Sequence, residues 1–193
     1  MKHLSDQELM RIVQAGDLAP ASEIYDRYST HVYNFAYRFL RNTAAAEDAT
    51  QEVFMKVIKH AGQYKSEAKF STWLFTITAN WCRDFMRKAD NKRKESDSIL
   101  MTLPASHEYS PERATELREN RNRVQDALSI LNDEQRAAIL LSRYQGLSYA
   151  EIAQISGCSE GAIKTRVFRA MEILKKALST ESPEGPECLT AMP

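Results

Sequence analysis

Residues 146–170, GLSYAEIAQISGCSEGAIKTRVFRA, hold the pattern that decides the fold of this chain. Ser148 followed by Glu151 fits the capping box, in which each side chain satisfies a free backbone N–H at a helix start. A short helix is therefore expected from Ser148 to Ile155. A turn over residues 156–159 follows, and Ser159 can cap a longer helix over residues 160–178. Two helices joined by a turn of this length form a helix-turn-helix.

The second of these helices has one apolar face, which we expect to be core. Its members recur at helical spacing: Ile163, Val167, Ala170, Met171, Leu174 and Leu178. The opposite side carries Thr165, Phe168, Arg169 and Glu172, with Lys164 and Arg166 on the two flanks. Cations neutralise phosphates, and side chains on an inserted helix read base edges in the major groove. This face therefore predicts DNA binding; the alternative is an ordinary solvated face, which most helical charges form.

The rest of the chain predicts an all-α fold of two small helical domains joined by a linker. Glycine and proline are few, with six of each, and the apolar residues recur at helical spacing. Further helix starts are marked by Ser5 with Glu8 and by Asn132 with Gln135. We expect an N-terminal domain over residues 1–94, a linker over 95–114, the helix-turn-helix domain over 115–178, and a disordered acidic tail over 179–193.

Composition excludes several classes of protein. Twenty-six basic and twenty-six acidic residues cancel, but residues 83–94 carry six bases against two acids while the tail carries three acids and no base. The three cysteines are far apart and lack histidines at metal-ligand spacing, so no metal or cofactor is expected. No catalytic constellation is visible, and the chain is not expected to be an enzyme. Without an apolar run long enough to span a bilayer, it is expected in the cytoplasm, with reduced thiols and no membrane insertion.

An acidic cluster lies on the expected helix AEDATQEVFMKVIKH, residues 46–60. Asp48 and Glu52 are i, i+4 neighbours, and like charges at this spacing cost a few tenths of a kcal/mol. Gln51 and Phe54 accompany them. A basic partner surface would relieve the repulsion; an ordinary solvated acidic patch is the alternative reading.

A polar stripe follows on the segment GQYKSEAKFSTWLFTITANWCRDFMRK, residues 62–88. We expect a loop from Gly62 to Phe70 and a helix from about Ser71. Two apolar faces of this helix leave one stripe between them: Thr76, Asn80, Arg83 and Arg87. Such an edge suits a nucleic-acid backbone and unstacked bases, with Tyr64, Phe70 and Trp73 as candidate stacking surfaces. Trp81 and Phe85 are expected in the core.

Taken together, AEDATQEVFMKV, FSTWLFTITANWCRDFMRK and LSYAEIAQISGCSEGAIKTRVFRA resemble the extracytoplasmic-function sigma factors of bacteria. The resemblance covers nearly the whole chain, in the family's order. It implies that the N-terminal domain binds the β′ clamp of core RNA polymerase through a D-x-x-Q-E motif, here Asp48, Gln51 and Glu52. It also implies that the 62–88 segment captures the melted −10 element.

The same resemblance implies that the C-terminal domain binds the β flap and reads the −35 element of promoter DNA. The residues for this are Lys164, Thr165, Arg166, Phe168 and Arg169, and an anti-sigma factor is the expected inhibitor. The alternative is an operator-binding helix-turn-helix regulator of the response-regulator type. That class needs a different N-terminal module, such as a receiver domain with strands, and no strand pattern is visible.

Overall fold

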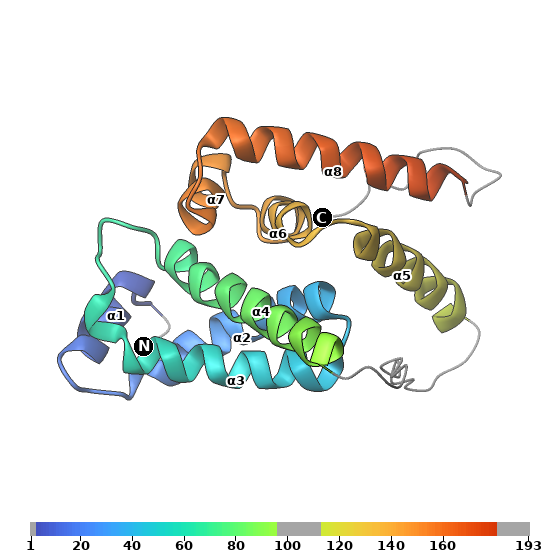
Figure 1. The fold of residues 1–193 in the computed structure, drawn as a ribbon. Coiled ribbons are helices and arrows are strands. Elements are labelled where there is room, and N and C mark those ends of the chain that lie inside the picture. The colour runs from blue at the N-terminus through green and yellow to red at the C-terminus, as the bar shows by residue number, and fades with distance from the viewer. Residues whose placement is uncertain (1–2, 96–112, 181–193) are drawn as a thin grey trace.

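A computed structural model describes residues 3–95 and 113–180 of the chain (Figure 1). These residues contain helices and no strand, as expected. The helices are α1 (Asp6–Gln14), α2 (Pro20–Leu40), α3 (Thr43–Lys59), η1 (Ala61–Gln63), α4 (Phe70–Glu95), α5 (Arg113–Ile130), α6 (Asp133–Ile139), η2 (Leu140–Tyr144), α7 (Tyr149–Ser156) and α8 (Glu160–Thr180). Most of the predicted linker, and the predicted tail beyond residue 180, lie outside the described residues. Residues 179 and 180 of that tail continue α8.

The predicted helix starts are confirmed by their caps. Capping boxes close the N-termini of α1, α6 and α7, where Ser5, Asn132 and Ser148 each accept a hydrogen bond from the third backbone N–H. Gly157 ends α7 with a φ of 62°, a left-handed conformation that glycine adopts without steric cost. The helix-turn-helix therefore lies where the pattern predicted it. Helix α4 begins at Phe70, one residue earlier than expected.

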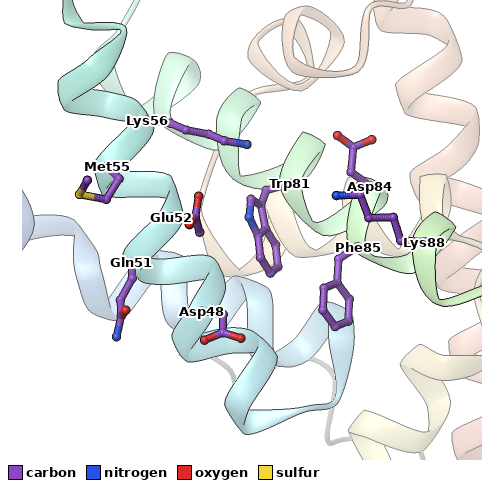
Figure 2. A pocket seen from close by; sticks show the side chains of 9 residues that line it. All are labelled: Asp48, Gln51, Glu52, Met55, Lys56, Trp81, Asp84, Phe85 and Lys88. Atoms are coloured by element: carbon purple, nitrogen blue, oxygen red, sulfur yellow. The ribbon is translucent and has the colours of Figure 1, made fainter.

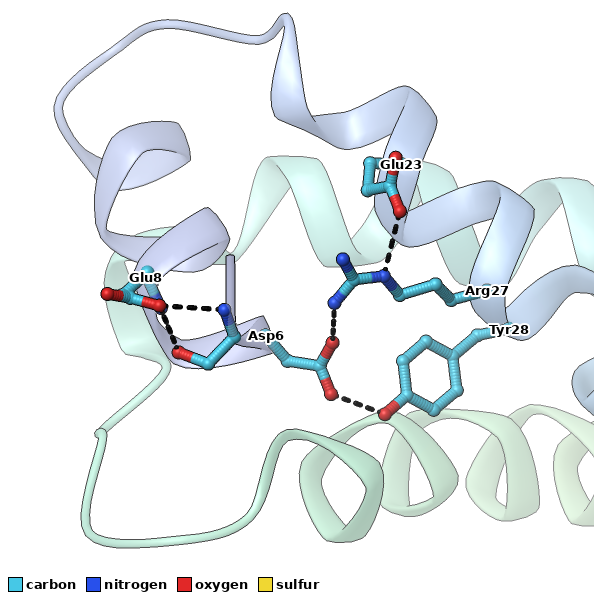
Figure 3. A network of polar contacts seen from close by, with 6 residues as sticks. Asp6, Glu8, Glu23, Arg27 and Tyr28 are labelled. Carbon is cyan, nitrogen blue, oxygen red and sulfur yellow. Dashed lines mark hydrogen bonds and ion pairs between the residues drawn. The ribbon is translucent and has the colours of Figure 1, made fainter. Parts of the chain in front are cut away.

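A polar network fixes α1 onto α2 (Figure 3). Asp6 accepts from Arg27 Nη1 at 2.8 Å and from the Tyr28 hydroxyl at 2.5 Å. Arg27 Nε also donates to Glu23 at 3.0 Å. Burial, together with the bond to Asp6, raises the pKa of Tyr28, so its hydroxyl remains a donor. The Tyr28 ring meets Phe70 edge-on at 5.2 Å, which links this network to the start of α4.

The two predicted domains share one hydrophobic core. The core cluster of α2, α3 and α4 around Phe35, Phe39 and Phe75 is continuous with the buried faces of α5, α6, α7 and α8. In Figure 1 the C-terminal helices α6, α7 and α8 lie above α4, with α3 on the opposite side. A second cluster around Leu9, Ile24 and Leu74 belongs to the N-terminal helices alone. Each domain therefore completes the burial of the other.

Side chains of α5 and α6 bind the C-terminal end of α2. The last carbonyls of a helix have no partner within it and need donors from elsewhere. Gln125 donates to the carbonyl oxygens of Tyr37 and Arg38 at 3.1 and 3.2 Å. Arg136, which is 8% exposed, donates to the carbonyl oxygen of Phe39 at 3.1 Å. The two domains are thus joined by polar contacts as well as by their core.

Two further contacts join the domains at the other end of the interface. Lys69 Nζ, just before α4, lies 3.0 Å from Glu151 Oε1 in α7. The His31 ring in α2 contacts Gln145 at 3.2 Å, and the Gln145 amide donates to the His31 carbonyl oxygen at 3.3 Å. Polar contacts therefore join the domains at more than one place along α2 and at the start of α4.

Candidate functional site

Helix α8 presents the predicted polar face to solvent. Ser159 caps the helix by accepting from the Ala162 N–H at 3.2 Å. Phe168 is 63% exposed, which is unusual for an aromatic ring in a folded chain, and Arg169 beside it is exposed. Lys164 is exposed and pairs with Glu160 one turn earlier, at 3.2 Å. The exposed Thr165, whose hydroxyl bonds back to a backbone carbonyl of its own helix, completes this surface.

Arg166 does not belong to that exposed face. Its guanidinium is 26% exposed and lies 2.7 Å from Glu134 in α6, and it also donates to the Cys158 sulfur at 3.3 Å. The predicted DNA contact of Arg166 stays a prediction. In this arrangement the side chain ties α8 to α6 and to the preceding turn.

Helix α4 carries the predicted polar stripe along one edge. Asn80 and Arg87 are exposed, while Thr76 and Arg83 are half-buried. Arg83 Nη1 donates to Asn80 Oδ1 at 2.8 Å, which uses the amide oxygen and leaves the amide N–H groups as the donors of this side chain. Arg87 pairs with Asp84 at 3.0 Å. The stripe is a row of polar side chains along α4, and Thr76, Arg83 and Arg87 each bond to a neighbour on the same helix.

The aromatic residues beside the stripe divide into two groups. Tyr64 and Phe70 are 5% and 2% exposed, and their rings pack edge-to-face at 5.8 Å. The Tyr64 hydroxyl donates to the Ala68 carbonyl at 3.0 Å, which fixes the loop on itself. The prediction that these two rings are open to a base needs correction, because both complete the core. Trp73 is half-buried and packs on Tyr64 at 5.4 Å, so part of its surface remains accessible.

On α3 the acidic cluster is exposed and its aromatic neighbour is not. Asp48, Gln51 and Glu52 all face solvent. Phe54 is 7% exposed and packs on Tyr25, with ring centroids 4.8 Å apart. Phe54 is therefore a support beneath the surface, and its predicted place on a binding face needs correction.

A groove lies between α3 and α4 and opens beside the acidic cluster (Figure 2). It has a volume of about 550 Å³. Its lining comprises Asp48, Gln51, Glu52, Met55, Lys56, Trp81, Asp84, Phe85 and Lys88. Sequence reasoning placed Trp81 and Phe85 in the core, but both are only half-buried. The sequence did contain a signal for this pair of rings: Trp81 and Phe85 are i, i+4 neighbours on the α-helix that follows the one with the acidic pair.

Other kinds of site find no support in residues 3–95 and 113–180. Within those ranges no cluster of histidine, cysteine and acidic side chains could hold a metal ion. None of the described helices is both long and apolar enough to cross a membrane. Burial raises the pKa of the Cys82 thiol to about 12, which leaves it protonated at neutral pH.

Comparison with known proteins assigns both domains. The family model described as sigma-70 region 2 matches residues 24–92, and that for sigma-70 region 4 matches residues 121–174. The ECF RNA polymerase sigma factor SigW of Bacillus subtilis is 34% identical, over 86% of this chain and 92% of its own length. The ECF sigma factor SigM of Mycobacterium tuberculosis is 32% identical, over 90% of this chain and 85% of its own length.

A solved structure has the same fold. The sigma factor RpoE of Bartonella quintana, crystallised with the anti-sigma factor NepR, superposes with a TM-score of 0.70 at 28% identity. The superposition covers 83% of this chain and 98% of that one. The two family models together match more than half of this chain, and the relatives align with most of it. The chain therefore belongs to the sigma-70 family of RNA polymerase sigma factors, within the extracytoplasmic-function class.

Proposed function

We propose that this sigma factor directs promoter-specific initiation through three surfaces: the acidic face of α3, the polar stripe of α4 and the outer face of α8. The observation that carries the proposal is the exposure of Asn80 and Arg169. Asn80 lies on α4, in the segment matched by region 2, and Arg169 lies on α8, in the segment matched by region 4; both helices are candidates for DNA binding. An operator-binding regulator needs only the outer face of α8, so that function does not account for the polar stripe of α4 or the acidic face of α3.

The α4 stripe handles the −10 element after the duplex has melted. Removing a base from the stack costs a few kcal/mol, and hydrogen bonds and ring contacts from the protein must offset this cost. Asn80 offers free amide donors, and the half-exposed Trp73 offers ring surface. Arg87 supplies phosphate contacts that weaken with salt. Base preference therefore resides with Asn80, and general affinity with the arginine.

The α8 face reads the −35 element in the major groove. Arg169 is free to form a paired contact with guanine, the commonest specific contact in that groove. Phe168 can contact a thymine methyl group, and Lys164 can contact phosphates. The Ser159 cap holds the first turn of α8 rigid, which fixes where these side chains enter the groove.

The acidic face of α3 binds core polymerase. Asp48 and Glu52 suit a basic clamp surface, because a partner cation removes their mutual repulsion. An anti-sigma factor holds the protein inactive, as NepR is the partner of the similar RpoE in its crystal structure. The protein acts in the cytoplasm, where its polymerase is found, and catalyses no reaction of its own.

Run-off transcription with purified core polymerase tests this function. The wild-type protein should confer initiation from a −35-dependent promoter, and Arg169→Ala should weaken −35 binding by about 1–3 kcal/mol. Arg11→Ala, which removes an exposed arginine of α1 on the other domain, serves as the control. Normal initiation by Arg169→Ala from that promoter would show that the −35 assignment is wrong.

The polymerase surface is tested separately by charge reversal. Glu52→Lys should lose core polymerase while keeping its melting temperature, because an exposed helical position tolerates substitution. Wild-type affinity in this variant would contradict the assignment of α3.

A further inference from the structure

The groove between α3 and α4 has walls of opposite character. In Figure 2 Glu52 and Asp48 lie on the α3 wall, and Trp81 and Phe85 project from α4 across from them. Gln51 and Met55 also belong to the lining on the α3 side. The C-terminal helices pack on α2 and α4, and α3 packs against α2 and α4 within the N-terminal domain. The groove is therefore available to a partner in the arrangement described.

The two carboxylates of the acidic wall form no ion pair within the described residues. Neither Asp48 nor Glu52 has a hydrogen bond or ion pair with any other part of the described chain. Lys56, one turn after Glu52 on α3, and Lys88 on α4 line the same groove, but neither is within ion-pair distance of these two carboxylates. Asp48 and Glu52 are like charges at i, i+4, which repel each other. A positive group held between them would relieve that repulsion.

The aromatic wall presents ring surface to that same space. Trp81 and Phe85 stack at 5.4 Å with their planes 15° apart, and both remain half-exposed. Aromatic rings are costly to leave in water and usually mark a contact site when they gather on a surface. A cation over an indole ring is attracted by the ring quadrupole, most strongly for tryptophan.

We infer that this groove binds an arginine side chain of core RNA polymerase, with its guanidinium stacked on Trp81 and its N–H groups directed to Asp48 and Glu52. This inference rests on the proposed role of α3 as the polymerase-binding face. Arginine fits better than lysine, because a planar guanidinium can stack on a ring and donate in parallel to a carboxylate at once. Trp81 is thereby a specificity-determining residue for polymerase binding.

Two substitutions of Trp81 distinguish the effect of its aromatic ring from the effect of its apolar volume. Trp81→Leu keeps an apolar side chain and removes the π surface, whereas Trp81→Phe keeps a ring. We expect Trp81→Leu to weaken binding of core polymerase about tenfold, and Trp81→Phe to lose less than about threefold. Leu18→Ala, which removes a 54%-exposed apolar side chain before α2, away from the groove lining, is the control and should bind normally. Melting temperatures check the fold, and Phe85→Leu replaces Trp81→Leu should the latter not fold.

A double-mutant cycle tests whether the two walls hold one partner group. Glu52→Gln combined with Trp81→Leu should lose less affinity than the product of the two single losses, because both remove contacts to the same guanidinium. Losses that multiply, or equal losses in Trp81→Leu and Trp81→Phe, would overturn the inference. Wild-type binding by Trp81→Leu, with binding lost in Glu52→Lys, also overturns it while leaving the proposed function intact. Wild-type binding by both variants contradicts the proposed polymerase face itself.

Discussion

Replacing Arg136 by alanine should cost the protein about 3 kcal/mol of folding free energy and loosen one domain from the other. The guanidinium donates to four carbonyl oxygens: those of Phe39, Leu128, Ser129 and Leu131, at 2.9 to 3.3 Å. Each such bond contributes a net 0.5–1.5 kcal/mol or so, which gives about 2–6 kcal/mol for the four. Burial lowers the pKa of Arg136, which shows that its charge is held at a desolvation cost. Because alanine has no charge to desolvate on folding, the variant avoids this cost, and that offsets part of the stability lost with the four hydrogen bonds.

Urea unfolding followed by two probes measures both effects. The two tryptophans, Trp73 and Trp81, lie in α4, so their fluorescence reports the N-terminal domain, while far-ultraviolet circular dichroism reports all helices. The two transitions should coincide in the wild-type protein and separate in Arg136→Ala, since the Phe39 carbonyl belongs to the other domain. Arg143→Ala, which removes an exposed arginine of η2, is the control and should stay within about 0.5 kcal/mol of wild type.

Two results would contradict this prediction, and they can be told apart. A change of stability no larger than that of the control would refute the energetic role of the guanidinium. Destabilisation with transitions that still coincide would refute its role in joining the domains.

Three further outcomes are expected. Hydrogen bonds from Ser148 lower the pKa of Glu151 below 4.5. The ionised carboxylate therefore stabilises the fold above pH 4.5, and this contribution is lost as the pH falls through the lowered pKa. In Glu151→Gln, the free energy of unfolding should consequently depend less on pH in the acid range. With the other two cysteines replaced, Cys82 should react with a thiol reagent at the rate of unfolding, because it is fully buried and protonated. On single-stranded −10 oligonucleotides at two salt concentrations, Asn80→Ala should lose base preference and Arg87→Ala salt-dependent affinity; the reverse result would exchange the two roles.

Local sequence signals predicted the helices well because their causes are local. A capping box such as Ser148 with Glu151 acts within four residues, so it can be read directly from the chain. The buried face of α8 follows from helical spacing alone, and Ile163, Val167 and Ala170 are all buried as expected.

What the sequence could not supply was the direction in which amphipathic side chains settle once the helices pack. Tyr64 and Phe70 can serve a core or a base equally well, and their burial depends on α1 and α2 meeting the loop. Arg166 has the reach to contact DNA or Glu134, and only the placement of α6 brings Glu134 to 2.7 Å from its guanidinium. Arg136 likewise reads as an ordinary helical cation until three helix ends converge on it. These outcomes depend on tertiary contacts far apart in sequence.

The clasp that α5 and α6 make on the end of α2 sets a threshold for promoter engagement. Elements centred near −35 and −10 are separated by roughly 25 base pairs, or roughly 85 Å of duplex at about 3.4 Å per pair. Here α7 of the helix-turn-helix packs directly on α4, and packed helices lie only about 8–10 Å apart. Reading both elements at once therefore requires the domains to part. The free energy needed to separate the domains reduces the free energy of DNA binding, and each 1.4 kcal/mol or so lowers the affinity about tenfold. An inhibitor that binds the form with the domains in contact therefore adds its binding free energy to a cost of separation that the fold already imposes.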